Sequence, residues 1–304
     1  MKHLLKMLDL SQQEIFDILD LADQLKYQTK HNIPHPILEG KTLGMIFQKA
    51  STRTRVSFEV GMYQLGGQAL FLSTNDLQIG RGEPIKDTAR VLSRYVDGIM
   101  IRTYSHAEVE ELAEYADVPV INGLTDDYHP TQVIADLITI QEHKGKLEGI
   151  KFAYVGDGNN MTHSLMIGCA KVGMDVTVAC PDGYMPNPEI VALAQGYAAE
   201  SGGSVTVMHD PKEAVKGVDV VYTDTWASMG QEAEKEIRKK AFVGYQVDDA
   251  MMALAKPDAI FMHCLPAYRG MEVTDEVMES AQSVVFDEAE NRLHAHKAIM
   301  ASVM

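Results

Sequence analysis

Residues 42–73 read TLGMIFQKASTRTRVSFEVGMYQLGGQALFLS, and this stretch decides the fold class. Short apolar runs open and close it, at 42–48 and 68–73, and both are typical of buried strands. The segment 56–67 between them has the apolar spacing of a helix, so we expect a strand, a helix and a second strand. Strands that alternate with helices indicate a parallel sheet of the βαβ kind.

The same alternation continues to residue 123, and it restarts after the turn-like segment 145–149. Capping boxes predict helices that begin after Ser11 and Ser105, with Glu14 and Glu108 as the partner residues. Further strands are expected at 98–103, 118–123, 151–156, 175–180, 204–209, 218–223, 259–264 and 283–286. We therefore predict an α/β protein with two βαβ-type domains, each a parallel sheet flanked by helices, and an active site in the interdomain cleft.

Composition narrows the classes of partner. The chain has 304 residues, enough for two domains, and its 27 basic and 43 acidic residues give a net charge of −16. Such a chain repels nucleic acid and anionic membranes, so any anion that it binds needs a local pocket of positive groups. No apolar run reaches the roughly 18 residues of a membrane span. Three cysteines without a CxxC pair favour a reducing compartment, and we expect a cytoplasmic protein.

The segment Ser51-Thr52-Arg53-Thr54 lies directly after the first strand. Hydroxyls, a guanidinium group and the N–H groups of a helix N-terminus together favour an anion site, because arginine binds phosphate through two parallel hydrogen bonds. A solvated turn whose Ser and Thr cap the helix fits the same residues.

Other polar side chains of the first half are expected near the same edge of the sheet. Arg102 ends a strand, and His129 with Gln132 begins a helix after the next strand. Ligands of open α/β sheets bind beyond the carboxyl ends of the strands, so these groups are predicted to converge. The glycine-containing loop 77–90 fits either a surface connection or a mobile segment that reaches into a site.

The second half offers weaker signals. The segment 155–164, VGDGNNMTHS, resembles the start of a dinucleotide site, but Met161 occupies the position of the third glycine. Asp224 ends a strand ahead of Ser228 and Met229. His263 and Cys264 end another strand, and one histidine provides too few ligands for a metal, so none is predicted.

Seven segments in order resemble the aspartate/ornithine carbamoyltransferase family over nearly the whole chain. SMG (228–230) and HCLP (263–266) are typical of the ornithine branch, whereas Thr131 and His296 depart from residues that are frequent in the family. The seven segments are FQKASTRTRVSFEVGMYQLGG (47–67), LQIGRGEPIKDTARVLSRYVDGIMIR (77–102), HPTQ (129–132), GDGNN (156–160), DTWASMG (224–230), HCLPAYRG (263–270) and ENRLH (290–294).

The resemblance implies transfer of the carbamoyl group of carbamoyl phosphate to the side-chain amine of ornithine, giving citrulline and phosphate in arginine biosynthesis. It implies a carbamoyl-phosphate-binding domain at 1–145, onto which a C-terminal helix at about 288–304 packs, and an ornithine-binding domain at 146–287. It further implies no cofactor, no metal, and a homo-oligomer, either a trimer or a multiple of trimers, in which a neighbour's loop completes each site.

The resemblance also implies the site residues. Carbamoyl phosphate would contact Ser51, Thr52, Arg53, Thr54, Gln78 from the neighbouring subunit, Arg102, His129, Gln132, Cys264, Leu265 and Arg292. Ornithine would contact Asn160, Asp224, Ser228 and Met229, and the catalytic residues would be Arg102, His129, Asp224, Cys264 and Arg292.

Three alternatives stay open at this point. A related enzyme could use another amine, such as putrescine or N-acetylornithine, although Asp224 and the segment 228–229 favour a free α-amino acid. A nicotinamide-dependent dehydrogenase lacks support because Met161 breaks the glycine pattern. The third alternative is a non-catalytic protein that keeps the fold and binds carbamoyl phosphate.

Overall fold

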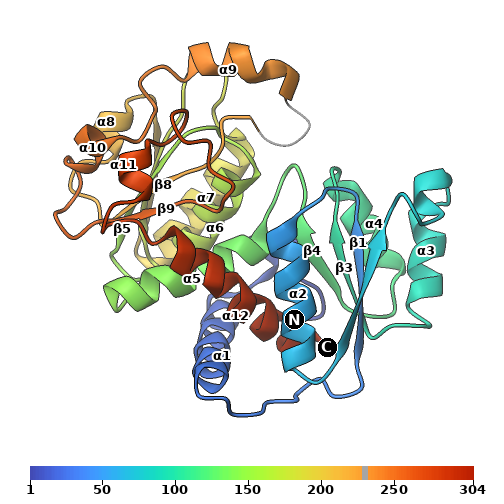
Figure 1. Cartoon of the computed structure of the whole chain (residues 1–304). Coiled ribbons are helices and arrows are strands. Elements are labelled where there is room, and N and C mark those ends of the chain that lie inside the picture. Colours follow the sequence, from blue (N-terminus) through green and yellow to red (C-terminus); the bar gives the residue numbers. More distant parts are fainter. Residues whose placement is uncertain (228–231) are drawn as a thin grey trace. The chain divides into compact units, whose positions relative to one another are not determined.

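The computed structural model describes residues 1–227 and 232–304. The chain divides into two compact units, the first made of residues 1–138 with 290–304 and the second of residues 139–289. Each unit contains one parallel sheet with helices around it, which confirms the predicted fold class (Figure 1). Within the described residues, no helix combines the length and the apolar character needed to cross a bilayer.

The first unit is built on a four-stranded sheet with the order β2-β1-β3-β4, in which every neighbouring pair is parallel. Its elements are η1 (Met7–Asp9), α1 (Gln12–Lys30), β1 (Thr42–Phe47), α2 (Thr52–Gln64), β2 (Gln68–Ser73), η2 (Ile79–Arg81), α3 (Ile85–Leu92), β3 (Gly98–Arg102), α4 (His106–Tyr115) and β4 (Val120–Leu124).

The second unit has a five-stranded parallel sheet with the order β7-β6-β5-β8-β9. Its elements are β5 (Lys151–Val155), α6 (Asn160–Lys171), β6 (Asp175–Ala179), α7 (Pro188–Ser201), β7 (Ser204–Met208), α8 (Pro211–Ala214), β8 (Val220–Thr223), η3 (Glu232–Glu234), α9 (Lys235–Ala241), α10 (Asp249–Met252), β9 (Ile260–Met262) and α11 (Asp275–Met278). Two helices, α5 (Pro130–Lys144) and α12 (Val285–Val303), contribute residues to both units.

One of the two predicted capping boxes is confirmed. Ser11 accepts a hydrogen bond from the N–H of Glu14, and the Glu14 carboxylate accepts one from the N–H of Ser11 at 2.8 Å. The helix predicted after Ser105 is confirmed, with Ser105 as the N-cap of α4, but the capping box is wrong, because the Ser105 side chain makes no capping bond. The Glu108 carboxylate instead accepts hydrogen bonds from the side chains of Thr103 and Gln48, which compete for the group that the box requires.

Two predicted boundaries also need correction. The helix expected at 56–67 begins at Thr52, four residues earlier, so the segment 51–54, expected at its N-terminus, forms its cap and first turn. The strand expected at 283–286 is not a strand. Ser283 makes one isolated bridge to Phe261, in which the peptide groups on either side of Ser283 hydrogen-bond to those of Phe261. The strand does not continue, because α12 begins at Val285.

Helix α12 closes the first unit by packing on α1 and α2 (Figure 1). A Cβ atom at Gly61 of α2 would lie 2.9 Å from Met300 Cε, so the glycine permits this close approach. Lys297 is fully buried there, and its ammonium bonds Thr29 Oγ1 at 2.6 Å, His35 Nε2 at 2.7 Å and Gln64 Oε1 at 2.9 Å. Burial lowers the pKa of Lys297 to about 8.

This lowered pKa predicts a stability effect at alkaline pH. Between the folded pKa and the ordinary value of 10.5, the unfolded chain binds more protons at Lys297 than the folded one, so the group's contribution to stability rises with pH. Relative to Lys297→Met, the unfolding free energy of the natural chain should increase by about 1–2 kcal/mol between pH 7.5 and 10.

Urea denaturation of both proteins across this pH range measures the difference. Lys30→Met supplies the control, because Lys30 is an exposed lysine on the neighbouring helix that pairs with Glu290. Its difference from the natural chain should stay constant. A constant difference for Lys297→Met as well would contradict the prediction.

Candidate active site

The N-terminus of α2 is positioned directly after the carboxyl end of β1. Ser51 is the N-cap in an extended conformation, and its hydroxyl accepts a hydrogen bond from the N–H of Thr54 at 3.2 Å. Thr52 and Arg53 occupy the first helical positions, whose N–H groups have no partner within a helix. Together with the helix dipole, this first turn favours a bound anion.

Three arginines of the first unit surround one buried imidazole. Arg102 and Arg292 are both nearly buried, and the Arg292 guanidinium donates to Thr54 Oγ1 at 2.7 Å. The pKa of His129 lies well below its ordinary value, first because the ring is buried and then because Arg292 and Arg102, followed by His296 and Arg53, act on it electrostatically. At pH 7, His129 is therefore neutral, and it can donate a hydrogen bond without adding charge.

This cluster concentrates positive charge locally, which an acidic chain needs in order to bind an anion. The structure brings together Arg53, Arg102, His129 and Arg292 from segments far apart in the sequence. Arg292 is buried, so the usual explanation of a solvated charge in a C-terminal helix does not hold for it.

Gln132 lies in the first turn of α5 and is fully buried. Its Nε2 donates to the Asp136 carboxylate at 2.8 Å. Because that bond assigns the NH₂ branch of the amide, Oε1 is the acceptor of this side chain. Gln78 is exposed immediately before η2, and its expected action in a neighbouring subunit stays a prediction.

In the second unit, three segments meet at the carboxylate of Asp224. Asn159 Nδ2 donates to it at 3.0 Å, the N–H of Thr225 at 2.7 Å and the Cys264 thiol at 3.2 Å. These groups follow β5, β8 and β9, which are neighbours in the sheet, so their carboxyl ends lie side by side. A buried carboxylate with further acceptor capacity is suited to an ammonium group.

Asn159 was missed by sequence reasoning, which singled out Asn160. Asn159 caps α6 by accepting from the N–H groups of Met161 and Thr162, while its amide reaches Asp224. Asn160 is buried one position further along, in the first turn. A helix-capping asparagine after a buried strand was the available signal.

The glycines of this loop have a structural reason. A Cβ atom at Gly158 would lie 2.3 Å from the backbone nitrogen of Pro186, so only glycine allows the two backbone segments to approach. The glycine pattern is therefore explained without a dinucleotide.

The backbone at Cys264 and Leu265 is held by a buried network that sequence reasoning also missed. The N–H of Leu265 donates to His263 Nδ1 at 2.9 Å, which leaves the ring hydrogen on Nε2, 3.2 Å from the Glu272 carboxylate. The N–H of His263 donates to Glu288 at 2.9 Å. Leu265 has a φ of +57°, a conformation that is unfavourable for leucine and that these bonds maintain.

The predicted shortage of metal ligands around His263 needs correction. One potential ligand atom each from Asp224, His263 and Cys264 lies within 4.8 Å of the others. The same residues, however, already make hydrogen bonds to one another and to their neighbours. Both His263 nitrogens are hydrogen-bonded, and the Cys264 thiol donates to Asp224.

Arg238 ties the loop after β5 to the segment after β8. It donates to Asp157 at 2.6 Å and to the carbonyl of Trp226 at 2.8 Å. Burial raises the pKa of Asp157 to about 6, against the opposing effect of Arg238. The predicted ligands Ser228 and Met229 lie outside the described residues.

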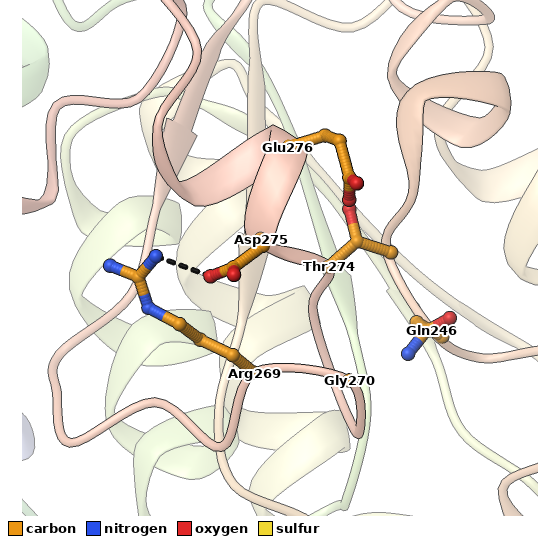
Figure 2. A pocket seen from close by; sticks show the side chains of 6 residues that line it. All are labelled: Gln246, Arg269, Gly270, Thr274, Asp275 and Glu276. Atoms are coloured by element: carbon orange, nitrogen blue, oxygen red, sulfur yellow. Dashed lines mark hydrogen bonds and ion pairs between the residues drawn. The ribbon is translucent and has the colours of Figure 1, made fainter.

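A separate hollow of about 390 Å³ lies beside α11 in the second unit (Figure 2). Figure 2 shows the Arg269 side chain directed at Asp275, and Arg269 also pairs with Glu279. The lining residues are Gln246, Arg269, Gly270, Thr274, Asp275 and Glu276, and they include none of the candidate site residues. Arg269 and Asp275 of this lining are exposed and pair with each other.

Comparison with known proteins places both units in one family. Residues 2–142 match the carbamoyl-P binding domain of aspartate/ornithine carbamoyltransferase, and residues 148–303 match the Asp/Orn binding domain. The chain is 61% identical over 296 residues to an ornithine carbamoyltransferase of Thermococcus kodakarensis, covering 97% of this chain and 94% of that protein. It is 63% identical over 300 residues to one of Carboxydothermus hydrogenoformans, covering 99% and 96%.

Solved structures agree with this result. Ornithine carbamoyltransferase from Pyrococcus furiosus has a TM-score of 0.97 at 59% identity, with 100% of this chain and 97% of that chain covered. Anabolic ornithine carbamoyltransferase from Campylobacter jejuni has a TM-score of 0.94 at 48% identity, with 100% and 99% covered. The chain therefore belongs to the aspartate/ornithine carbamoyltransferase family.

Proposed function

We propose that the chain transfers the carbamoyl group of carbamoyl phosphate to the side-chain amine of L-ornithine, forming L-citrulline and phosphate. The observation that carries this proposal is the cluster of Arg53, Arg102 and Arg292 around the neutral His129, beside the N-terminus of α2. The names of relatives about 60% identical over almost the whole chain support ornithine as the acceptor.

The first unit is assigned to carbamoyl phosphate and the second to ornithine. In the first unit, Ser51, Thr52, Arg53 and Thr54 bind the phosphate group. The leaving phosphate is an anion, and helix N–H groups with a fixed cation stabilise it as its charge develops. The descriptions of the two matching family models support this division.

The carbamoyl carbonyl is polarised by hydrogen-bond donors. Arg102, His129 and Thr54 are directed to its oxygen, where negative charge develops as the amine adds to the carbon. Gln132 Oε1 accepts from the carbamoyl NH₂, an orientation consistent with the bond from its Nε2 to Asp136. Arg292 and the backbone at Cys264 and Leu265 complete this contact set.

The amino acid is recognised by opposite charge. Asp224 binds the α-ammonium group, with Ser228, and Asn160 binds the carboxylate, with the backbone at Met229. The neutral side-chain nitrogen attacks the carbonyl carbon, the new C–N bond forms, the bond from carbon to the phosphate oxygen breaks, and the nitrogen loses a proton. Cys264, hydrogen-bonded to Asp224, acts by position and not as a covalent nucleophile.

The active protein is proposed to be a trimer or a multiple of trimers, in which Gln78 of a neighbouring copy contacts the phosphate. The exposed position of Gln78 is compatible with this role. Three free cysteines suit a reducing compartment and support a cytoplasmic location.

Removal of the Arg102 guanidinium should slow the reaction. Arg102→Met eliminates one donor to the developing oxyanion, and we expect kcat to fall by about 10²–10³-fold. Citrulline formation at saturating substrates measures the effect. Arg90→Met, at an exposed arginine of α3 paired with Asp87, is the control and should keep its activity. Equal rates for the two variants would remove Arg102 from the mechanism.

The rate should increase with pH. The side-chain amine of ornithine resembles that of lysine, with a pKa near ~10.4, so its reactive neutral fraction grows about tenfold per pH unit below that value. His129 is neutral throughout this range. We expect kcat/KM for ornithine to rise from pH 6 to pH 9. A flat profile, with chemistry shown to be rate-limiting, would contradict the proposal.

The direct test offers ornithine, putrescine, N-acetylornithine and aspartate separately with carbamoyl phosphate. Phosphate release with ornithine, matched mole for mole by citrulline, is the expected result. Release with another amine alone would retain the role of the first unit and overturn that of the second. Carbamoyl phosphate that binds without any release would leave a non-catalytic binder.

A further inference from the structure

His296 of α12 lies against the first two turns of α2. It is fully buried, its ring stacks on that of Phe58 with centroids 3.9 Å apart and planes 17° apart, and its Nδ1 is 2.8 Å from Ser57 Oγ. The mechanism proposed above does not use this imidazole.

The direction of the hydrogen bonds around Ser57 follows from its single hydroxyl hydrogen. Ser57 Oγ lies 2.5 Å from the carbonyl oxygen of Arg53 and 3.2 Å from that of Thr54, and both are acceptors only. The hydroxyl therefore donates to these carbonyls and accepts from His296, whose hydrogen is on Nδ1. Burial, and then the charge of Arg292, hold the pKa of His296 well below its ordinary value, so the ring stays neutral.

The two carbonyls belong to the first turn of α2, whose N–H groups bind the phosphate in the proposed function. Arg292, one helical turn before His296 on α12, donates to Thr54 Oγ1 in the same turn. Residues four apart on one helix share a face, so Arg292 and His296 both face α2, where they hydrogen-bond to Thr54 and Ser57 respectively.

We propose that His296 is a positioning residue for the phosphate pocket, acting through Ser57 to fix the first turn of α2. This inference rests on the proposed function, in which that turn binds the phosphate of carbamoyl phosphate. The imidazole does not touch substrate. It donates to a hydroxyl that in turn donates to the backbone of Arg53, and this holds the neighbouring N–H groups in the orientation that an anion requires.

His296→Leu removes the donor and keeps an apolar side chain over Phe58. We expect the KM for carbamoyl phosphate to rise roughly fivefold to tenfold, as for the loss of one well-oriented hydrogen bond. The inhibition constant of inorganic phosphate should rise by the same factor, while the KM for ornithine at saturating carbamoyl phosphate stays unchanged. His296→Gln, whose amide can donate to Ser57, should restore both constants to within about twofold.

Ser57→Ala tests the relay without altering the histidine. It should reproduce the phosphate effect of His296→Leu, and the double variant should show no further loss, because both changes break one chain of bonds. It also keeps the test available if His296→Leu does not fold.

His294→Leu is the matched control. His294 lies on the same helix and is 2% exposed, but it pairs with Glu290 rather than α2. This variant should lower the melting temperature and leave both phosphate constants unchanged.

Unchanged constants in both His296→Leu and Ser57→Ala would overturn the positioning role and leave a packing role. The same rise in His296→Gln as in His296→Leu would also overturn it. Failure of the proposed function is recognised separately, because the natural chain would then release no phosphate with any amine. In that case, calorimetry measures the dissociation constant of inorganic phosphate for the natural chain and its variants. The inference then expects the same fold-changes in this constant as those given above for the inhibition constant.

Discussion

Both groups of site residues depend on one constraint, the parallel direction of the strands. Ser51 follows β1, Arg102 ends β3 and His129 follows β4, and these three strands are neighbours. The segments after β5, β8 and β9 have the same relation in the second unit. If one strand ran the other way, its polar end would face the opposite edge of the sheet. The strands can therefore be largely apolar, while the polar site residues lie at or just beyond their carboxyl ends.

The first unit must concentrate positive charge in a chain of net charge −16. Three guanidinium groups around one imidazole repel one another, and burial strengthens that repulsion. The neutral state of His129 limits the cost, because a fourth positive charge is avoided. A phosphate that enters such a pocket relieves the repulsion, so binding energy is available there before any contact to the rest of a substrate is made.

The sequence predicts the elements that depend on the local spacing of apolar and polar residues. Every strand of both sheets is predicted in this way, and so is the helix N-terminus at segment 51–54. The prediction fails where hydrogen bonds to residues elsewhere in the chain determine the local structure. The Glu108 carboxylate, expected to complete a capping box, accepts hydrogen bonds from Thr103 and from Gln48, 60 residues away. Ser283 lies beside Phe261, so a strand-like run forms one bridge and then a helix.

Helix α12 has a consequence for how the chain is made. The compact unit that contains the first 138 residues also needs residues 290–304, which are synthesised only after all of the second unit. Its core cannot be completed earlier, and Lys297, Arg292 and His296 reach their partners only after residues 139–289 have been synthesised. The second unit, a continuous segment, is free of this delay. The second unit can therefore complete its core before the first, and a chain that lacks α12 also lacks Arg292 and the contacts of Lys297 and His296 with the first unit.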